Sequence, residues 1–338
     1  MRARRTTARL AARAAPHAVS RRSSALATAT TSNLNKGSIH PTAIVEPGCR
    51  LGKDVNIGPY CVVGSDVTLG DAVRLDSHVR VDGHTTIGAS SSVQSFATVG
   101  ATPQDLKYSG EPSVLHVGER CRIFEYAHLS GGTAAGGGVT SIGDDCLLMS
   151  NTHVAHDCVL ASNVILASSA ALAGHVHVGR GARISGYSCV HQNVSVGQGA
   201  FLGGGSVLVS DLIPYGLAVG NRASLHGLNL RGLRRESVPL DELRTMLSCF
   251  RYLFEQPDEG YYKPLPLPHR QTIGERASLC AEDDGYARYP MLREMVRFVL
   301  GRRTVAAAGG AAGSASSSGA NRDDGGGELV GRSLCRPP

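Results

Sequence analysis

Four residues whose side chains can do chemistry lie close together in NTHVAHDC, residues 151–158: His153, His156, Asp157 and Cys158. Imidazole, carboxylate and thiol groups can ligate a metal ion. A histidine with a neighbouring carboxylate can also act as a general base with its orienting partner. A third interpretation is a solvated surface cluster. The local spacing does not distinguish these three interpretations. The secondary-structure elements that position the four residues must therefore be considered first.

A six-residue repeat of aliphatic residues runs through most of the chain. It takes every sixth residue from Ile39 to Val99, from Val117 to Leu129 and, after a shift of one residue, from Ile142 to Leu208, 26 positions in all. A period of six fits neither an α-helix nor simple strand alternation. It fits a coil of three short strands and three corners, with the aliphatic residues pointing inward. The repeat therefore predicts a parallel β-helix of eight to nine coils.

Two other positions of the repeat have a restricted composition. Glycine often follows the aliphatic residue directly, where we expect corners that need the backbone freedom of glycine; these are Gly52, Gly58, Gly64, Gly70, Gly88, Gly100, Gly118, Gly143 and Gly179. The residue two before the aliphatic position is usually small or β-branched. Five of the nine cysteines occupy this position, namely Cys49, Cys61, Cys121, Cys146 and Cys158. We therefore expect these five to fill the core and not to bind metal.

Two segments interrupt the repeat. Residues 101–116 place Asp105 and Glu111 where aliphatic residues belong, and residues 131–141 are rich in glycine. Both should leave the coil as loops, and loops on a regular scaffold commonly carry functional residues.

A helical region should follow the repeat. The apolar spacing of residues 237–256 predicts an amphipathic helix, with Ser237 as N-cap and Pro239 in the first turn. Shorter helical stretches are expected at about 275–282 and 290–301. A small helical cap on the end of the β-helix is the simplest arrangement.

Composition divides the chain further. Eight basic and no acidic residues lie in 1–36, and removing their charges takes the formal net charge from +6 to −2. The remainder is thus not basic enough to indicate nucleic-acid binding, and no apolar run approaches the roughly 20 residues of a membrane span. The Arg-, Ala-, Ser- and Thr-rich leader indicates organellar import, into a mitochondrion or alternatively a plastid. The expected organisation is a transit peptide at 1–37, the β-helix at 38–215, a helical domain at 216–303 and a disordered low-complexity tail at 304–338.

The repeat places the histidines on one outer edge. One coil is eighteen residues, so one coil beyond His156 is Gly174, beside His175. Two coils beyond it is Gln192, beside His191. These positions should stack about 4.8 Å apart. None of these residues is at an aliphatic position of the repeat, so all should point away from the core. Together they could form a chemical site along this edge.

Several longer stretches resemble one family. NTHVAHDC, ALAGHVHVG (171–179), CVHQNVSVG (189–197), QDLKYSGEP (104–112), GNRASLHGLNLRGLRR (220–235) and IHPTAIVEPG (39–48) are similar to UDP-N-acetylglucosamine O-acyltransferases. The resemblance covers about residues 38–300. It implies an all-β, left-handed parallel β-helix with a C-terminal helical cap, assembled as a homotrimer. It also implies transfer of a 3-hydroxyacyl chain from acyl carrier protein to the 3-hydroxyl of UDP-N-acetylglucosamine, the first step of lipid A-type biosynthesis, without a metal or other cofactor.

The resemblance also assigns roles. His156 matches the general base, Asp157 its orienting partner and the backbone N–H of Gly174 the oxyanion donor. The other matching positions are His153, His175, His191 and Gln192 for substrate contact, Gln104, Asp105 and Lys107 for the sugar nucleotide and acyl group, Asn229 and Arg235 for the nucleotide, and Gly203, Gly204 and Gly205 for acyl-chain length.

The chain also departs from the family pattern. Ser130 and Gly131 replace a His-Arg pair, Arg231 replaces an acidic residue, SSA at 168–170 replaces an Asn-rich run, and Asn193 replaces an aromatic residue. Two alternatives stay open, the first because of the stacked histidines and the second because of these departures. One is a zinc-dependent hydratase similar to gamma-class carbonic anhydrases, which place three histidines on zinc. The other is a non-catalytic trimeric scaffold.

Overall fold

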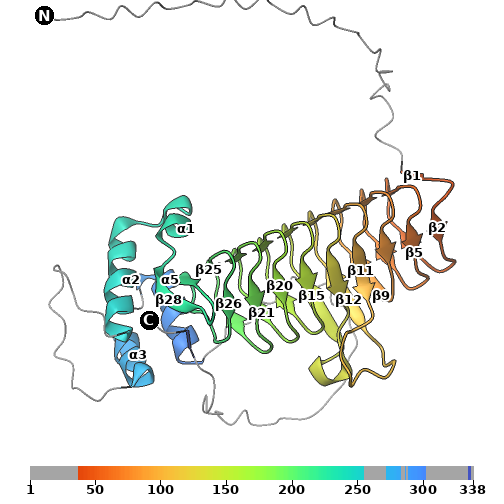
Figure 1. Ribbon diagram of the computed structural model, residues 1–338. Helices are drawn as coiled ribbons and strands as arrows, with labels where there is room; N and C mark the ends of the chain where they lie inside the picture. Colours follow the sequence, from red (N-terminus) through yellow and green to blue (C-terminus); the bar gives the residue numbers. More distant parts are fainter. Residues whose placement is uncertain (1–36, 255–271, 283–285, 287, 302–333, 336–338) are drawn as a thin grey trace, which may run out of the picture. The chain divides into compact units, whose positions relative to one another are not determined.

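The chain forms a parallel β-helix followed by helices (Figure 1). The computed structural model describes residues 37–254, 272–282, 286, 288–301 and 334–335. The strands make three sheets of 11, 9 and 8 strands, which we call A, B and C. Each coil contributes one short strand to each sheet, and each strand pairs in parallel with the strand of the next coil. The predicted architecture is confirmed.

Most strands are two residues long, as expected for six-residue sides. Sheet A contains β1 (Ser38–Ile39), β4 (Asn56–Ile57), β7 (Arg74–Leu75), β10 (Ser92–Val93), β13 (Arg122–Ile123), β16 (Leu147–Leu148), β19 (Ile165–Leu166), β22 (Arg183–Ile184), β25 (Phe201–Leu202), β27 (Gly216–Val219) and β28 (Ser224–Leu228). Sheet B contains β2 (Ile44–Val45), β5 (Val62–Val63), β8 (Arg80–Val81), β11 (Thr98–Ala101), β14 (His128–Ser130), β17 (His153–Val154), β20 (Ala171–Leu172), β23 (Cys189–Val190) and β26 (Val207–Leu208). Sheet C contains β3 (Arg50–Leu51), β6 (Thr68–Leu69), β9 (His84–Ile87), β12 (Val114–Val117), β15 (Val139–Ile142), β18 (Val159–Leu160), β21 (His177–Val178) and β24 (Ser195–Val196).

The register between coils is the predicted eighteen residues. Val154 lies opposite Leu172, which lies opposite Val190. All three are at most 2% exposed, so the aliphatic residues stack in a column inside the coil. The first coil is the exception, since Ile39 and Leu51 are 49% and 37% exposed. These residues have stacking partners on one side only.

The corners correct our expectation about glycine. Of the nine glycines that follow an aliphatic residue, only Gly100 has a positive φ. The left-handed conformation instead falls two residues later and mostly on residues other than glycine, such as Tyr60, Asp157 and His175, with φ of 58° to 60°. Glycine is needed for space: a Cβ on Gly143 would lie 2.6 Å from the backbone nitrogen of Ser162 in the next coil.

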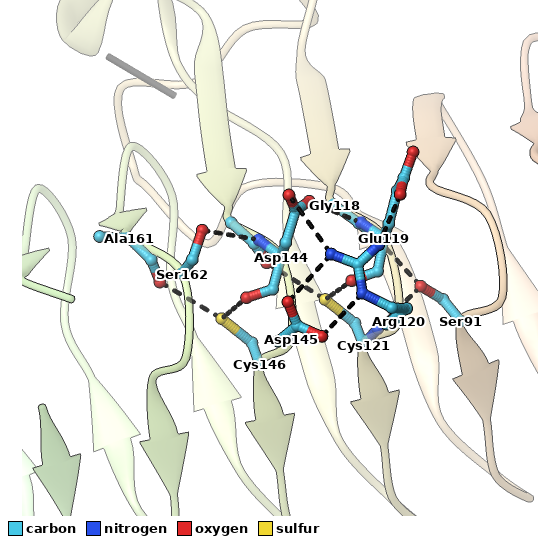
Figure 2. Close-up of polar contacts among 11 residues, drawn as sticks. Ser91, Gly118, Glu119, Arg120, Cys121, Asp144, Asp145, Cys146, Ala161 and Ser162 are labelled. Carbon is cyan, nitrogen blue, oxygen red and sulfur yellow. Dashed lines mark hydrogen bonds and ion pairs between the residues drawn. The ribbon is translucent and has the colours of Figure 1, made fainter. Parts of the chain in front are cut away.

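The cysteines at the small-residue position fill the core as predicted. Cys61, Cys121, Cys146 and Cys158 are at most 1% exposed, and Cys49 is half-buried. Their thiols donate to backbone carbonyls of the next coil, as Cys146 does to Ala161 at 3.3 Å (Figure 2). Burial accordingly raises the pKa of the Cys158 thiol to about 12. Since the thiolate is the form that binds metal, this raised pKa disfavours metal binding by Cys158.

The region after the repeat is not helical from its start. β27 and β28 form an antiparallel pair at the end of sheet A. The helices are α1 (Leu230–Arg235), α2 (Leu240–Leu253), α3 (Ile273–Glu282) and α5 (Pro290–Val299), of which α1 was not predicted. One hydrophobic core runs from the β-helix into these helices and includes Leu228, Phe250 and Val296. The cap thus packs on the end of the β-helix.

The start of α2 differs from the prediction. Its N-cap position is Pro239, and no side chain caps it. Ser237 lies before the helix with φ of 55°, so the predicted cap was wrong. Pro239 has no N–H to satisfy and tolerates this position, while Asp241 and Glu242 in the first turn complement the helix dipole.

Most of the two predicted tails lies outside the described residues. Within 304–338 the structure describes Leu334 and Cys335. These two residues have a defined position, whereas the sequence analysis predicted a disordered tail. The N–H of Cys335 donates to the carbonyl of Asp211 at 2.8 Å, and Cys335 is 3% exposed. Across the described part of the chain, helices are all too short or too polar to cross a bilayer.

Steric crowding at the glycine position gives a stability prediction. Gly143→Ala should lower the free energy of unfolding by about 1–3 kcal/mol, because the added methyl group meets rigid backbone. Gly204→Ala is the matched control: its Cβ would have its nearest neighbour at 3.6 Å, and its φ is not positive. Urea denaturation of both variants checks this. If the two variants have equal free energies of unfolding, steric crowding does not explain the glycine at position 143.

Candidate active site

The predicted edge exists where the chain passes from sheet B to sheet C. The backbone N–H of His175 donates to the carbonyl of His156 at 3.0 Å, and that of Asn193 donates to the carbonyl of Gly174 at 3.1 Å. The rings of His156 and His175 meet edge to face, with centroids 5.1 Å apart. His156 is nevertheless only 7% exposed, so it is less open to solvent than a residue on a bare edge.

His156 and Asp157 form a hydrogen-bonded pair. Nδ1 of His156 lies 2.7 Å from Oδ2 of Asp157, whose side chain is 1% exposed. An ionised carboxylate only accepts hydrogen bonds, so Nδ1 carries the proton and the lone pair is on Nε2. This is the tautomer that a general base needs. Adjacent residues can form this pair because Asp157 has the left-handed backbone conformation, with φ of 60°.

The predicted loop at 131–141 covers Asp157 through Thr133, a contact that the sequence analysis did not predict. The backbone N–H of Thr133 donates to Oδ1 of Asp157 and its hydroxyl donates to Oδ2, both at 2.7 Å. The short helix η2 (Ala134–Gly136) follows. A Cβ on Gly136 would collide with the Asp157 carboxylate, so glycine lets the loop lie flat on it. The carboxylate thus has three donors, which offset the cost of burying its charge.

Gly174 lies directly against the His156 ring. An added Cβ would be 2.5 Å from Cε1 and 2.7 Å from Nε2 of His156. Gly174 is buried, and its backbone N–H has no acceptor among the described residues. Buried N–H groups without an acceptor are rare. It belongs to a residue that lies against the ring of the candidate base, which suits an oxyanion donor.

His153 belongs to a second pair, on the strands of sheet B that lead into the His156 edge. Its ring stacks on that of His128 in the preceding coil, with centroids 5.1 Å apart. Burial lowers the pKa of both imidazoles, and His128 and His156 lower that of His153 further. Nδ1 of His128 is buried without a partner among the described residues. Burial therefore favours the neutral form of both rings.

His156, Asp157 and His175 are also the candidate metal ligands. One ligand atom of each can be chosen so that all lie within 4.8 Å of one another. Two ligands of one tetrahedral zinc, each about 2.0–2.2 Å from it, are separated by more than 3 Å. The 2.7 Å between His156 and Asp157 is instead a hydrogen-bond distance, and Thr133 already donates to both carboxylate oxygens. The geometry fits a proton-transfer pair better than a zinc site.

The first loop leaves the prism at the same edge. It joins β11 to β12, as the Thr133 loop joins β14 to β15 (Figure 1). Oε1 of Glu111 lies 3.4 Å from the backbone nitrogen of Ala134, which links the two loops. Asp105 accepts from the backbone N–H of Lys107 at 3.0 Å, while Gln104 and Lys107 are exposed. No contact joins these three predicted residues to His156 within the described chain.

The other predicted residues lie elsewhere. Asn229 is the N-cap of α1. Its side-chain Oδ1 accepts from the backbone N–H of Gly232, and its side-chain Nδ2 donates to the carbonyl of Gly199, both at 3.0 Å. This gives Asn229 a structural task that the sequence analysis did not foresee. Arg235 is exposed at the end of α1. His191 and Gln192 are exposed on the His156 edge.

Gly203, Gly204 and Gly205 follow β25 and lie at a different edge, where sheet A passes into sheet B. Gly203 is buried, whereas Gly204 and Gly205 are exposed. Within one chain, this predicted acyl-chain region is thus not part of the His156 edge.

Comparison with known proteins identifies the family. Residues 211–305 match the model of domain 2 of UDP-N-acetylglucosamine O-acyltransferase, and residues 140–174 match the bacterial transferase hexapeptide repeat. The acyl-(acyl-carrier-protein)–UDP-N-acetylglucosamine O-acyltransferase of Sulfurovum sp. is 50% identical over 218 residues, which are 64% of this chain and 84% of that protein. The chain belongs to the UDP-N-acetylglucosamine O-acyltransferase family. The protein of the same name from Paraburkholderia phymatum is 46% identical over 64% of this chain and 83% of its own length.

Solved structures of the acyltransferase family agree with the fold. LpxA from Acinetobacter baumannii superposes with a TM-score of 0.71 at 33% identity, covering 77% of this chain and 96% of that one. UDP-N-acetylglucosamine acyltransferase from Arabidopsis gives 0.65 at 32% identity, covering 77% and 95%. The prism is therefore the predicted left-handed parallel β-helix with a C-terminal helical cap.

Gly131, one of the departures from the acyltransferase pattern, has a steric explanation. A Cβ on Gly131 would collide with the Ser113 hydroxyl of the first loop. The place of a larger side chain is thus taken by the loop itself. Ser130 beside it is fully buried, and its hydroxyl has no partner among the described residues.

The His128–His153 pair gives a pH prediction. Because their folded-state pKa values are lowered, the unfolded chain binds more protons as the pH falls through the ordinary value of about 6.5. Stability should therefore fall between about pH 7 and about pH 5, above the range where carboxylates titrate. His128→Gln removes one titrating ring and should reduce the fall in melting temperature. A fall of the same size in the variant would contradict the assignment.

Proposed function

We propose that this acyltransferase moves a 3-hydroxyacyl chain from acyl carrier protein to the 3-hydroxyl of UDP-N-acetylglucosamine, the first step of lipid A-type biosynthesis. The carrying observation is the His156–Asp157 pair, 2.7 Å apart, with Gly174 against the His156 ring and no acceptor for the Gly174 N–H among the described residues. The names of the Sulfurovum and Paraburkholderia relatives state the same donor and acceptor. The donor specificity for 3-hydroxyacyl chains comes from the family resemblance.

The chemistry follows from the atoms available. Nε2 of His156 takes the proton of the sugar 3-hydroxyl as that oxygen attacks the thioester carbonyl. The carbonyl oxygen becomes an oxyanion and accepts a hydrogen bond from the N–H of Gly174. Asp157 stabilises the imidazolium that forms. When the intermediate collapses, the C–S bond breaks and the imidazolium returns its proton to the departing carrier thiolate. No redox step occurs, so none of these atoms calls for a cofactor.

The remaining site residues belong to the proposal as substrate contacts. His175, His191 and Gln192 share the His156 edge, and His153 lies on β17 just before it. Gln104, Asp105 and Lys107 are on the first loop, which leaves the same edge. Arg235 is suited to a phosphate of the nucleotide because its guanidinium can bind two oxygens at once. We propose that Asn229 acts indirectly, by holding α1.

We propose that the enzyme is a homotrimer and that neighbouring prisms complete each site. Support comes from the placement of Gly203, Gly204 and Gly205 on a different edge from His156. One prism alone cannot bring the two edges together. Two prisms packed side by side can, with His156 of one chain facing residues of the next.

We also propose that residues 1–37 form a transit peptide, that the β-helix domain is 38–215 and the C-terminal domain 216–303, and that the mature enzyme works in a mitochondrion, with a plastid as the alternative. Support for import is the leader, with eight basic and no acidic residues in 1–36. The Arabidopsis neighbour comes from an organism whose cells contain both organelles.

Replacing the base tests the proposal. The full chain, incubated with UDP-N-acetylglucosamine and a series of 3-hydroxyacyl carrier proteins, should yield a 3-O-acylated sugar detectable by mass spectrometry. His156→Ala should reduce its rate by about 10²–10⁴-fold, because proton transfer is lost. His40→Ala, an exposed histidine on the first coil, should leave the rate unchanged.

The outcomes separate the alternatives. Full activity of His156→Ala would refute the base assignment. No product from the unaltered chain, together with no binding of UDP-N-acetylglucosamine by calorimetry, would favour the scaffold.

Thr133 should act as a positioning residue through Asp157. Thr133→Val removes the hydroxyl donor to Oδ2 at nearly constant volume, and a hydrogen bond to a charged group is worth about 1.5–3 kcal/mol. The expected result is a fall in kcat of about tenfold or more with little change in KM. Thr133→Ser keeps a hydroxyl and should restore most of the rate. If Ser and Val variants lose activity equally, the hydroxyl does not position Asp157.

A further inference from the structure

Two cysteines outside the β-helix lie in contact. Cys249 is on α2 and Cys280 is on α3, and their sulfur atoms are 3.4 Å apart. Cys249 is 8% exposed, and Cys280 is partly exposed. Neither belongs to the hexapeptide pattern, and neither is near the His156 edge. The proposed transferase reaction therefore does not use this pair.

The separation suits a disulfide. A disulfide holds its sulfur atoms about 2.05 Å apart, with the two Cβ atoms about 3.5–4.5 Å apart. Thiols already at 3.4 Å can reach this by side-chain rotation and a small approach of the two helices. The two residues are 31 positions apart, so the bond would close a long loop.

The pair differs from the cysteines of the β-helix. Cys121 and Cys146 are also neighbours, but they are 0% and 1% exposed and their thiols donate to backbone carbonyls (Figure 2). No oxidant can reach them without opening the coil. Cys189 is exposed on β23. Only the pair on α2 and α3 combines sulfur contact with access to solvent among the described residues.

We propose that Cys249 and Cys280 form a reversible intrachain disulfide when the protein meets a small-molecule disulfide oxidant. The more exposed Cys280 loses its proton and attacks the oxidant, which releases one thiol and leaves a mixed disulfide. The Cys249 thiolate then attacks Cys280 Sγ and displaces the second thiol. One protein S–S bond forms, one oxidant S–S bond breaks, and the two cysteine protons go to the released thiols.

The helix that would be tied down is weakly held. Of the ten residues of α3, only Arg276 and Ala277 are buried, whereas α2 buries six of its fourteen. Helices with few buried contacts open most readily. A covalent bond to α2 would therefore act mainly on α3. The disulfide makes the attachment of α3 to the cap depend on redox conditions.

Oxidising the full chain with oxidised glutathione tests this. After alkylation and digestion, mass spectrometry should find the Cys249 and Cys280 peptides joined, while Cys189 carries glutathione. Amide hydrogen exchange in α3 should slow by about tenfold or more, because opening now strains a covalent link. Dithiothreitol should reverse both changes. The reaction and its readouts are independent of transferase activity.

Two variants complete the design. Cys280→Ser should abolish the joined peptide and the slower exchange, whereas Cys189→Ser should keep both. Three results would overturn the proposal: glutathione remaining on Cys280, a disulfide between two chains, or no change at the pair while Cys189 reacts fully.

Discussion

The hydrogen-bonded register between coils is the constraint on which the site depends. Backbone hydrogen bonds join each coil to its neighbour at nearly constant spacing; His175 donates to His156 of the preceding coil, and Asn193 donates to Gly174. The buried aliphatic column prevents a slip of even one residue, because a slip would turn leucine and valine outward. Residues eighteen apart in sequence are therefore fixed neighbours. The relative positions of the site residues on the edge are fixed because the core beneath them allows only one register.

The corners convert that register into side-chain directions. At most corners the residue in the left-handed conformation is not glycine, and Asp157 and His175 are two of them. This conformation costs an L-residue about 1–2 kcal/mol. It also turns the Asp157 carboxylate back onto His156, its own neighbour in sequence. Gly174 is needed for a different reason: any other residue would place its Cβ atom against the His156 ring. Strain and crowding at the corner are thus used to shape the site.

Sequence reasoning succeeded where the repeat operates and failed where it stops. The stacking of His156, Gly174 and His175 followed from counting residues, because three sides of six residues place positions eighteen apart on successive coils. Thr133 was missed because its loop has no period, and a Gly-rich run indicates a loop without saying what it covers. The cap of α2 was misjudged at Ser237, which has a left-handed backbone conformation and lies two residues before the N-cap position. Contacts between distant segments, such as the sulfur pair on α2 and α3, leave no local signal.

The buried state of Asp157 shows that the two loops are part of the site. A carboxylate on an open edge would be solvated, and water would compete for its contact with His156. Here Thr133 supplies two donors, and Glu111 of the first loop supports the neighbouring Ala134. The first loop also carries the predicted sugar-nucleotide residues. The first loop and the donors of Asp157 are therefore joined by one chain of contacts, from Glu111 through Ala134 to Thr133.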